Sequence, residues 1–419
     1  MPTRFWHPFA EMGSVAEAEC VITRGEDVWV FDSEANRLLD ATASLWYANV
    51  GHGRTQIADA IAAQMREIES YSCFGDFATP PALALCERLA ALAPVDDARI
   101  FLTTGGGEAI ETAAKLARRY WSLRGAPDRT VLISRSRSYH GAHGYGTSLG
   151  GIDANREGFG ELVPHTVQIP HDSSEALAAK IDELSADRVA AFFLEPVIGV
   201  GGVIPPQDGY IQQVAAICEE HAVLLVIDSV ICGFGRLGSW LGIERFRVRP
   251  DLICFAKGVT SGYLPLGGVI VSGRVAEPFW SQGAPAFRHG PTYAGHAACC
   301  AAALANLDIL EQEGLIERGA QLELPLLRAL MPLAESAAVA EVRGGVGMLA
   351  AVALSEEILQ ARPDAVSLLL SGARRRGVLV RALAGAVAIS PPLTATVEHF
   401  EMIAQALGGA IAELEEAAG

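Results

Sequence analysis

Short runs of apolar residues recur along the middle of the chain, and each run ends in polar or charged residues. Such runs lie at 99–103, 130–134, 189–195, 224–228 and 251–256. Runs of this length, bounded by polar turns, are typical of strands buried on both faces, as in a parallel sheet covered by helices. The pattern therefore predicts an α/β fold with a mainly parallel sheet.

Segments with the apolar spacing of helices alternate with these runs. Helices are predicted at 55–69, 108–121 and 209–221, and one more strand is predicted at 266–272. Alternation of strands with helices along a chain is the pattern of a parallel sheet with helical crossovers, so these segments extend the same α/β unit.

The two ends of the chain carry a different pattern. Apolar stretches at 28–32 and 38–41 flank a polar turn, which predicts a small β-meander. After a long helix rich in alanine and leucine at 297–313, short strands are predicted at 347–352 and 378–381, followed by terminal helices. These segments predict a smaller α+β domain to which both chain ends contribute.

With 419 residues the chain is long enough for two closely associated domains. We expect residues 1–54 to form the N-terminal part of the small domain and residues 55–298 to form the large domain. Residues 299–419 are then expected to hold a connecting helix and the rest of the small domain.

Composition narrows the classes of function. The net charge is −17, with 49 acidic and 32 basic residues, which argues against nucleic acid or an anionic membrane as a partner. No apolar run is long enough to cross a bilayer, and the first eight residues do not resemble a signal peptide. The eight scattered cysteines lack CxxC spacing and indicate a reducing compartment, so we expect a cytoplasmic protein.

Two predicted strands end in residues that can do chemistry together. Asp228 closes one apolar run and Lys257 follows the next. The carboxyl end of a strand in an open α/β sheet faces the crevice where ligands bind. A lysine can form a Schiff base with an aldehyde cofactor, and an aspartate can keep a pyridine nitrogen protonated, so the pair suits pyridoxal phosphate (PLP). A structural ion pair is the alternative explanation for these two residues.

The residues around this pair resemble the signature of class III aminotransferases, which are PLP enzymes of fold type I. Segments 228–236 and 256–267 carry the resemblance, and further motifs extend it from about Phe5 to Leu393. The resemblance implies a large PLP-binding domain with a mainly parallel seven-stranded sheet and a smaller α+β domain from both chain ends. It also implies Lys257 as the catalytic residue and Asp228 as the partner of the pyridine nitrogen. Ser229 departs from the family, which usually has glutamate there.

A phosphorylated cofactor needs an anion-binding cup, and backbone N–H groups at a helix N-terminus provide one. Gly105, Gly106 and Gly107 lie between a predicted strand and a predicted helix. The family usually reads Ser-Gly-Ser-Glu-Ala at this place, so glycine replaces both serines here. We expect the cup to rely on main-chain donors, although a triple glycine also fits a simple tight turn.

The resemblance assigns further residues to the cofactor. Tyr139, followed by His140, is expected to stack on the pyridine ring, and Val230 to pack on its opposite face. Glu195 is expected near the cofactor in a supporting or gating role. Thr292 matches a threonine that binds the cofactor phosphate of the other subunit, which implies at least a homodimer with shared active sites.

The expected substrate pocket resembles that of ω-transaminases, the amine:pyruvate branch. Trp46 matches the tryptophan that forms the pocket wall, and Tyr139 also faces the substrate. Arg381 lies where that branch has a mobile arginine, which binds a substrate carboxylate in a bidentate manner and moves aside for amines without one. A solvated surface arginine is the alternative explanation for Arg381.

We therefore predict ping-pong transamination from an amine or ω-amino acid to an oxo-acid, with pyruvate as the expected acceptor. Alternatives on the same scaffold are diaminopelargonate-type, ornithine-type or aminobutyrate-type transaminases, an epimerase or a decarboxylase. A non-catalytic PLP-binding protein is a more remote alternative, because such a protein would most simply have lost Lys257 or Asp228, and both are present.

Two patterns suggest other kinds of site. Residues 146–150 match the serine-hydrolase pattern G-x-S-x-G, which requires a strand before it and a helix after it. The flanking residues predict neither element. His140 and His143 could bind a metal, but no carboxylate or cysteine at ligand spacing completes a set, so no metal site is expected.

Overall fold

A seven-stranded sheet forms the centre of the larger lobe of the protein, whose computed structural model describes residues 3–418. Its strands are β4 (Arg99–Thr103), β5 (Val131–Arg135), β6 (Thr166–Ile169), β7 (Val189–Leu194), β8 (Leu224–Asp228), β9 (Leu252–Phe255) and β10 (Gly267–Val271). Their order is β4-β10-β9-β8-β7-β5-β6, and only β10 runs antiparallel to its neighbours. The prediction of a mainly parallel sheet is confirmed.

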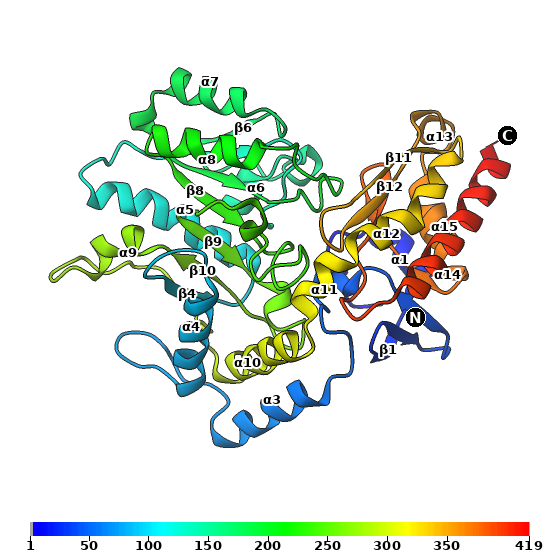
Figure 1. Ribbon diagram of the computed structural model, residues 1–419, viewed down its shortest axis with the longest axis horizontal. Coiled ribbons are helices and arrows are strands. Elements are labelled where there is room, and N and C mark those ends of the chain that lie inside the picture. The colour runs from blue at the N-terminus through cyan, green and yellow to red at the C-terminus, as the bar shows by residue number, and fades with distance from the viewer. Residues whose placement is uncertain (1–2, 419) are drawn as a thin grey trace.

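Successive residues of the central strands pack on opposite faces of this sheet, which explains their continuous apolar runs. In β8, Leu224 and Val226 join the core beneath α5 (Gly106–Leu123), whereas Leu225 and Ile227 join the core on the other side, with α8 (Tyr210–Glu220). The other helices of this lobe are α3 (Thr55–Glu67), α4 (Pro80–Leu92), α6 (Gly144–Leu149), α7 (Ser174–Leu184), α9 (Gly273–Trp280) and α10 (Ala297–Gln312). The sheet is thereby covered on both faces (Figure 1).

Both chain ends meet in the smaller lobe, which contains two four-stranded sheets (Figure 1). The first consists of β1 (Ile22–Glu26), β2 (Trp29–Asp32), β3 (Arg37–Asp40) and β13 (Val378–Leu379). The second consists of β11 (Val339–Arg343), β12 (Ala350–Leu354), β15 (Ala386–Ile389) and β14 (Arg381–Leu383). Because β13 pairs with β3, the predicted small α+β part from both ends is confirmed. The exact boundaries at 54 and 298 stay predictions, and residues 1, 2 and 419 lie outside the described residues.

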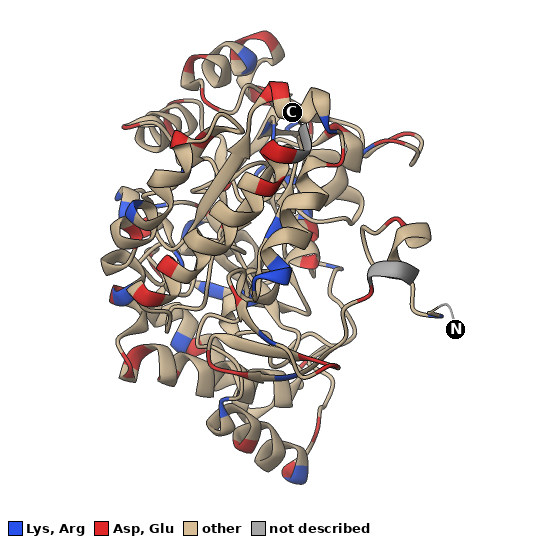
Figure 2. Ribbon diagram, turned by 90° about the vertical axis from the view of Figure 1, so that its right-hand side faces the viewer, with Lys and Arg blue, Asp and Glu red and all other residues tan. Residues whose placement is uncertain are grey.

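Helices complete the smaller lobe. They are α1 (Met12–Ala18), α2 (Ala43–Trp46), α11 (Leu315–Gln321), α12 (Glu323–Leu330), α13 (Glu356–Ala361), α14 (Ala365–Arg375) and α15 (Val397–Ala418). α14 and α15 pack against each other, and α12 packs on α15. Within residues 3–418, no helix has both the length and the apolar composition that a membrane crossing requires. Acidic and basic residues are interspersed over the face seen in Figure 2.

Four local predictions were wrong in detail. The strand predicted at 347–352 begins later, because Met348 donates its N–H to Arg236 instead of to a sheet neighbour. The single strand predicted at 378–381 is divided between β13 and β14, which belong to different sheets. The helix predicted from residue 108 begins at Gly106, and β6 was not predicted at all, since its residues are mostly only half-buried.

Arg236 ties the two lobes together. Its side chain is fully buried, and its guanidinium donates to the carbonyl oxygens of Met348 (3.1 Å) and Pro391 (2.6 Å) and to Asn49 Oδ1 (2.8 Å). Burial lowers the pKa of Arg236 to about 10, so the group stays charged at neutral pH. One cation in the loop after β8 thus fixes a segment from each end of the chain.

We expect Arg236→Met to lower the free energy of unfolding by about 3 kcal/mol, because three buried acceptors lose a charged donor. Equilibrium urea unfolding measures the change. The matched control is Arg249→Met, which removes an exposed ion pair to Asp96 and should change stability by less than about 1 kcal/mol. Equal effects of the two substitutions would contradict the proposed tie.

Candidate active site

The carboxyl ends of β8 and β9 place Asp228 and Lys257 side by side. Asp228 is the last residue of β8 and pairs in register with Cys254 of β9, three residues before Lys257. Both residues line a cavity of about 570 Å³. The same cavity is lined by every predicted cofactor residue except Thr292, namely Gly105, Gly106, Gly107, Tyr139, His140, Glu195, Asp228, Val230 and Lys257. The parallel sheet therefore brings together residues that are far apart in the sequence.

Lys257 has the properties of a reactive amine. Its burial lowers the pKa of the amine, while the carboxylates of Asp228 and Glu195 act in the opposite direction. The residue keeps partial exposure, toward the cavity. Its backbone has φ +48°, in the left-handed region that residues with side chains rarely adopt and that is common at functional sites. A lowered pKa favours the neutral amine, which can attack a carbonyl carbon and accept a proton.

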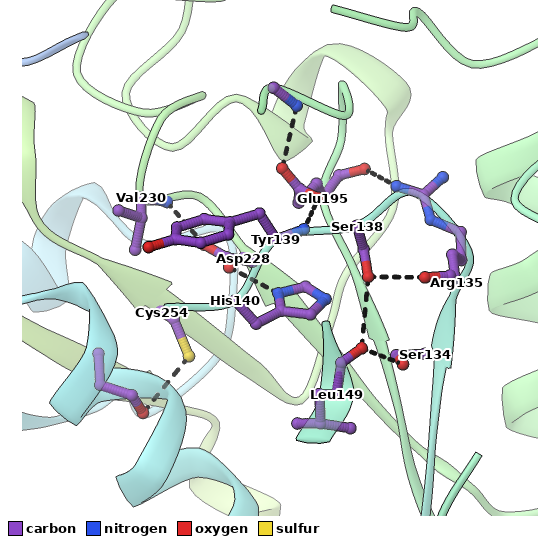
Figure 3. A network of polar contacts seen from close by, with 12 residues as sticks. Ser134, Arg135, Ser138, Tyr139, His140, Leu149, Glu195, Asp228, Val230 and Cys254 are labelled. Carbon is purple, nitrogen blue, oxygen red and sulfur yellow. Dashed lines mark hydrogen bonds and ion pairs between the residues drawn. The ribbon is translucent and has the colours of Figure 1, made fainter. Parts of the chain in front are cut away.

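Asp228 is held in place by two protein donors. Its Oδ2 lies 2.8 Å from His140 Nδ1, and its Oδ1 accepts the N–H of Val230 at 3.1 Å (Figure 3). The side chains of Asp228 and His140 are both buried. The carboxylate is therefore fixed in orientation before any ligand arrives. Sequence reasoning placed His140 at the cofactor, but it did not foresee that its ring would contact this carboxylate.

Glu195 is a buried carboxylate that holds backbone groups. It accepts the N–H of Tyr139 at 3.1 Å and the N–H of Gly199 at 3.0 Å (Figure 3). Burial raises its pKa, an effect that nearby His140 reduces. Glu195 thus fixes the loop that carries the Tyr139 ring, a geometry that supports a positioning role.

The start of α5 offers the expected anion cup. The N–H groups in the first turn of a helix have no acceptor within the helix, and they point out of its end. Gly106 is required by crowding, because a Cβ there would lie 2.9 Å from both methyl groups of Val230. The Thr104 hydroxyl donates to the Glu108 carboxylate at 2.7 Å, so this hydroxyl is not a free donor for an anion in the cavity.

A second cavity of about 840 Å³ adjoins the first and shares Leu45, Tyr139 and Lys257 with it. Trp46 and Arg381 line this cavity, and the Arg381 guanidinium carbon lies 4.9 Å from the centre of the Trp46 ring. Arg381 forms no ion pair with any described carboxylate, and its buried Nε has no hydrogen-bond partner within residues 3–418. Burial lowers its pKa. The arginine is therefore poised for an anionic ligand.

Thr292 does not reach the site within this chain. It is exposed and belongs to the segment 290–296, outside the residues that line either cavity. Sequence reasoning also missed two neighbours of the site. Phe9 packs edge-on against Tyr139 with ring centres 6.4 Å apart, and Arg137 lines the second cavity. Arg137 lies only two residues before Tyr139, but no spacing rule marks it as a lining residue, and Phe9 comes from the N-terminal segment 6–9, far away in the sequence.

The competing patterns find no support in the structure. Ser148 of the G-x-S-x-G match lies inside α6, and its hydroxyl donates to Gly144 at 2.6 Å, so it is not on a strand-to-helix turn. Among residues 3–418, no group of three or more His, Cys, Asp or Glu side chains is arranged to hold a metal ion.

Comparisons with known proteins agree with this geometry. The family model described as aminotransferase class III matches residues 12–411. The chain belongs to the class III aminotransferase family. A putrescine–pyruvate aminotransferase of Pseudomonas aeruginosa is 38% identical over 409 residues, covering 92% of this chain and 89% of that protein. A beta-alanine–pyruvate aminotransferase of the same organism is 34% identical, covering 97% and 95%.

Solved structures show the same fold. An amine transaminase from an uncultivated Pseudomonas species, described as PLP-bound, has a TM-score of 0.93 and 37% identity, covering 98% of this chain and 99% of that one. The aminotransferase is thus a PLP enzyme of fold type I that catalyses transamination. The residues present fit the cofactor: a buried amine, a fixed carboxylate and a helix N-terminus line one cavity.

We expect Lys257 to be the lysine that binds the cofactor covalently. The chain contains only Lys115, Lys180 and Lys257, so borohydride reduction of the PLP-loaded protein followed by peptide mass mapping gives a direct answer. Label should appear on Lys257 alone, and Lys257→Ala should lower transamination by about 10³-fold or more. Lys115→Ala and Lys180→Ala are the controls and should keep both label and activity. Label on either of those lysines in the unaltered protein would overturn the assignment.

Proposed function

We propose that this aminotransferase transfers an amino group from an amine or ω-amino acid to an oxo-acid, with pyruvate as the acceptor. The observation that carries the proposal is the unpaired, largely buried guanidinium of Arg381 beside Trp46, in a cavity that joins Lys257. The names of the putrescine–pyruvate and beta-alanine–pyruvate relatives support the same class of substrates.

Arg381 suits a carboxylate that arrives with the substrate. A buried cation without a counter-ion is costly, and a planar guanidinium binds a carboxylate through two parallel hydrogen bonds. The Trp46 ring supports the guanidinium from one side while the substrate approaches from the cavity. An amine that lacks a carboxylate has no use for this cation, so its binding requires Arg381 to move aside.

The residues around the first cavity then divide the work of the reaction among them. When bound, PLP supplies an electron-withdrawing ring that stabilises negative charge on the substrate carbon. We assign Lys257 to covalent attachment and to carrying the proton, and Asp228, held by His140, to the pyridine nitrogen. Tyr139 and Val230 confine the ring, and Glu195 holds Tyr139 in position.

A second arginine raises a second candidate acceptor. Arg137 lines the same cavity as Arg381, and its Nε donates to Gly201 at 3.2 Å, which leaves its terminal nitrogens available. Two cations in one cavity could bind the two carboxylates of a dicarboxylic oxo-acid such as 2-oxoglutarate. We favour pyruvate because Arg137 already donates to a backbone carbonyl, whereas within residues 3–418 the Arg381 side chain has neither a hydrogen bond nor an ion pair.

We expect Arg381→Leu to lower kcat/KM for pyruvate about 100-fold, the loss of one bidentate charged contact, while the half-reaction with a simple amine changes by less than about threefold. Stopped-flow absorbance of each half-reaction separates the two effects. Arg343→Leu is the control, because Arg343 binds Gly202 and Glu341 and does not line the cavity.

Arg137→Leu tells the two acceptors apart. For the pyruvate proposal the substitution leaves the preference for pyruvate over 2-oxoglutarate unchanged. If the unaltered protein prefers 2-oxoglutarate and Arg137→Leu selectively loses turnover of 2-oxoglutarate, the acceptor is the dicarboxylate and not pyruvate. If Arg381→Leu lowers kcat/KM equally for pyruvate and for the simple amine, Arg381 does not bind the substrate carboxylate.

We also propose a homodimer in which Thr292 binds the cofactor phosphate of the partner subunit. Thr292 is exposed, and so are the neighbouring Tyr293 and Phe74, whose ring reaches Gly290 of the same segment. Exposed apolar patches of this kind mark protein interfaces. We place the protein in the cytoplasm, which its eight free cysteines support.

Subunit mixing tests the shared site. Lys257→Ala and Thr292→Glu should each be inactive alone, whereas after subunit exchange the mixture should recover about a quarter of the unaltered activity, because half of random dimers are hybrids with one complete site each. As a control, mixing Lys257→Ala with Asp228→Ala should restore nothing, since both residues belong to the same site. No recovery in the first mixture, despite verified exchange, would refute the sharing of Thr292.

A further inference from the structure

The His143 side chain occupies the space that a side chain at position 107 of the phosphate cup would fill. A Cβ built on Gly107 would lie 2.2 Å from His143 Nδ1 and 2.6 Å from its Cε1, far inside any real contact distance. The imidazole therefore fills the space into which a side chain at position 107 would project. A serine at 107 and His143 in this position exclude each other.

The ring also brings a hydrogen-bonding atom to that space. Nδ1 is the atom of His143 nearest to the Cβ position, so a nitrogen stands close to where a seryl hydroxyl at 107 would lie. His143 precedes α6 and lines the same cavity as Lys257. No hydrogen bond joins its ring to another side chain or backbone group within residues 3–418, whereas the ring of neighbouring His140 is bound to Asp228.

The two threonine hydroxyls that line the cavity already donate to other groups of the protein. The Thr104 hydroxyl donates to Glu108 at 2.7 Å, and the Thr260 hydroxyl donates to Leu264 at 2.6 Å. The cup itself consists of glycines, which offer backbone N–H groups only. An anion at the start of α5 would thus find the imidazole of His143 as a side-chain donor beside Gly107.

We propose that His143 binds the cofactor phosphate and replaces the hydroxyl that the glycine at 107 lacks. The imidazole donates a hydrogen bond to a phosphate oxygen, and in its charged form it adds an ion pair. Gly107 and His143 are then one unit: the glycine makes room for the ring, and the ring supplies the donor. This inference rests on the PLP cofactor and not on which amine or oxo-acid the enzyme uses.

The first test compares two cofactors that differ only in the phosphate. We expect His143→Ala to weaken PLP binding to the apoprotein about tenfold, the loss of one charge-assisted hydrogen bond, and to leave the dissociation constant of pyridoxal unchanged. Absorbance titration gives both constants without any substrate. His221→Ala, at the C-terminal end of α8 and outside the lining of the cavity, is the control and should change neither.

The second test uses the exclusion between the two side chains. Gly107→Ser alone should weaken PLP binding, because its side chain collides with the imidazole. In the His143→Ala background the same substitution should strengthen binding, because the hydroxyl then has room and restores a donor. A general loss of folding cannot explain a Gly107→Ser effect on PLP affinity that is negative in one background and positive in the other.

Three results would overturn the proposal. One is an equal loss of affinity for PLP and pyridoxal in His143→Ala, and another is no loss for either. The third is a Gly107→Ser substitution whose effect is the same in both backgrounds. Because all of these measurements omit substrates, they remain separate from a failure of the proposed substrate class.

Discussion

The active site depends on burying an amine and two carboxylates in one place, where water cannot stabilise their charges. Such burial is tolerable only when each charge has protein partners. Asp228 has His140 and the Val230 N–H, and Glu195 has two backbone N–H groups. Within residues 3–418 no hydrogen bond or ion pair holds the Lys257 amine, and burial lowers its pKa, which favours the neutral, nucleophilic form. The two carboxylates are held by hydrogen bonds and the amine is not, and this difference distinguishes the candidate reactive group from the supporting ones.

The sheet makes this arrangement possible, and a single buried cation connects it to the smaller lobe. Parallel strands end at one edge, so the last residue of β8 and the first residues after β9 meet there without any specific side-chain design. Arg236 lies in the loop after β8 and binds Asn49 from one chain end and Pro391 from the other. The segments that carry Trp46 and Arg381 are thereby held against the same edge.

The sequence was sufficient to predict the parts of the site that follow from local pattern. Asp228 and Lys257 were found because each interrupts a buried apolar run, and the sheet followed from those runs. The division of residues 378–381 between β13 and β14 could not be foreseen, because it depends on two different partners, β3 and β15. The contact between His140 and Asp228 and the place of His143 beside Gly107 likewise join segments that no spacing relates.

Arg381 in the second cavity interacts electrostatically with Lys257, which lines both cavities. Burial is the main cause of the lowered pKa of Lys257, and the positive charge of Arg381 lowers it further. If Arg381 binds a substrate carboxylate as proposed, that carboxylate offsets the positive field, and the Lys257 amine becomes a stronger base when the substrate is in place. With a simple amine, the proposal leaves Arg381 without this partner and has the side chain move aside. On this proposal, carboxylate binding does more than select a substrate: it also adjusts the basicity of the lysine that we assign to carry the proton.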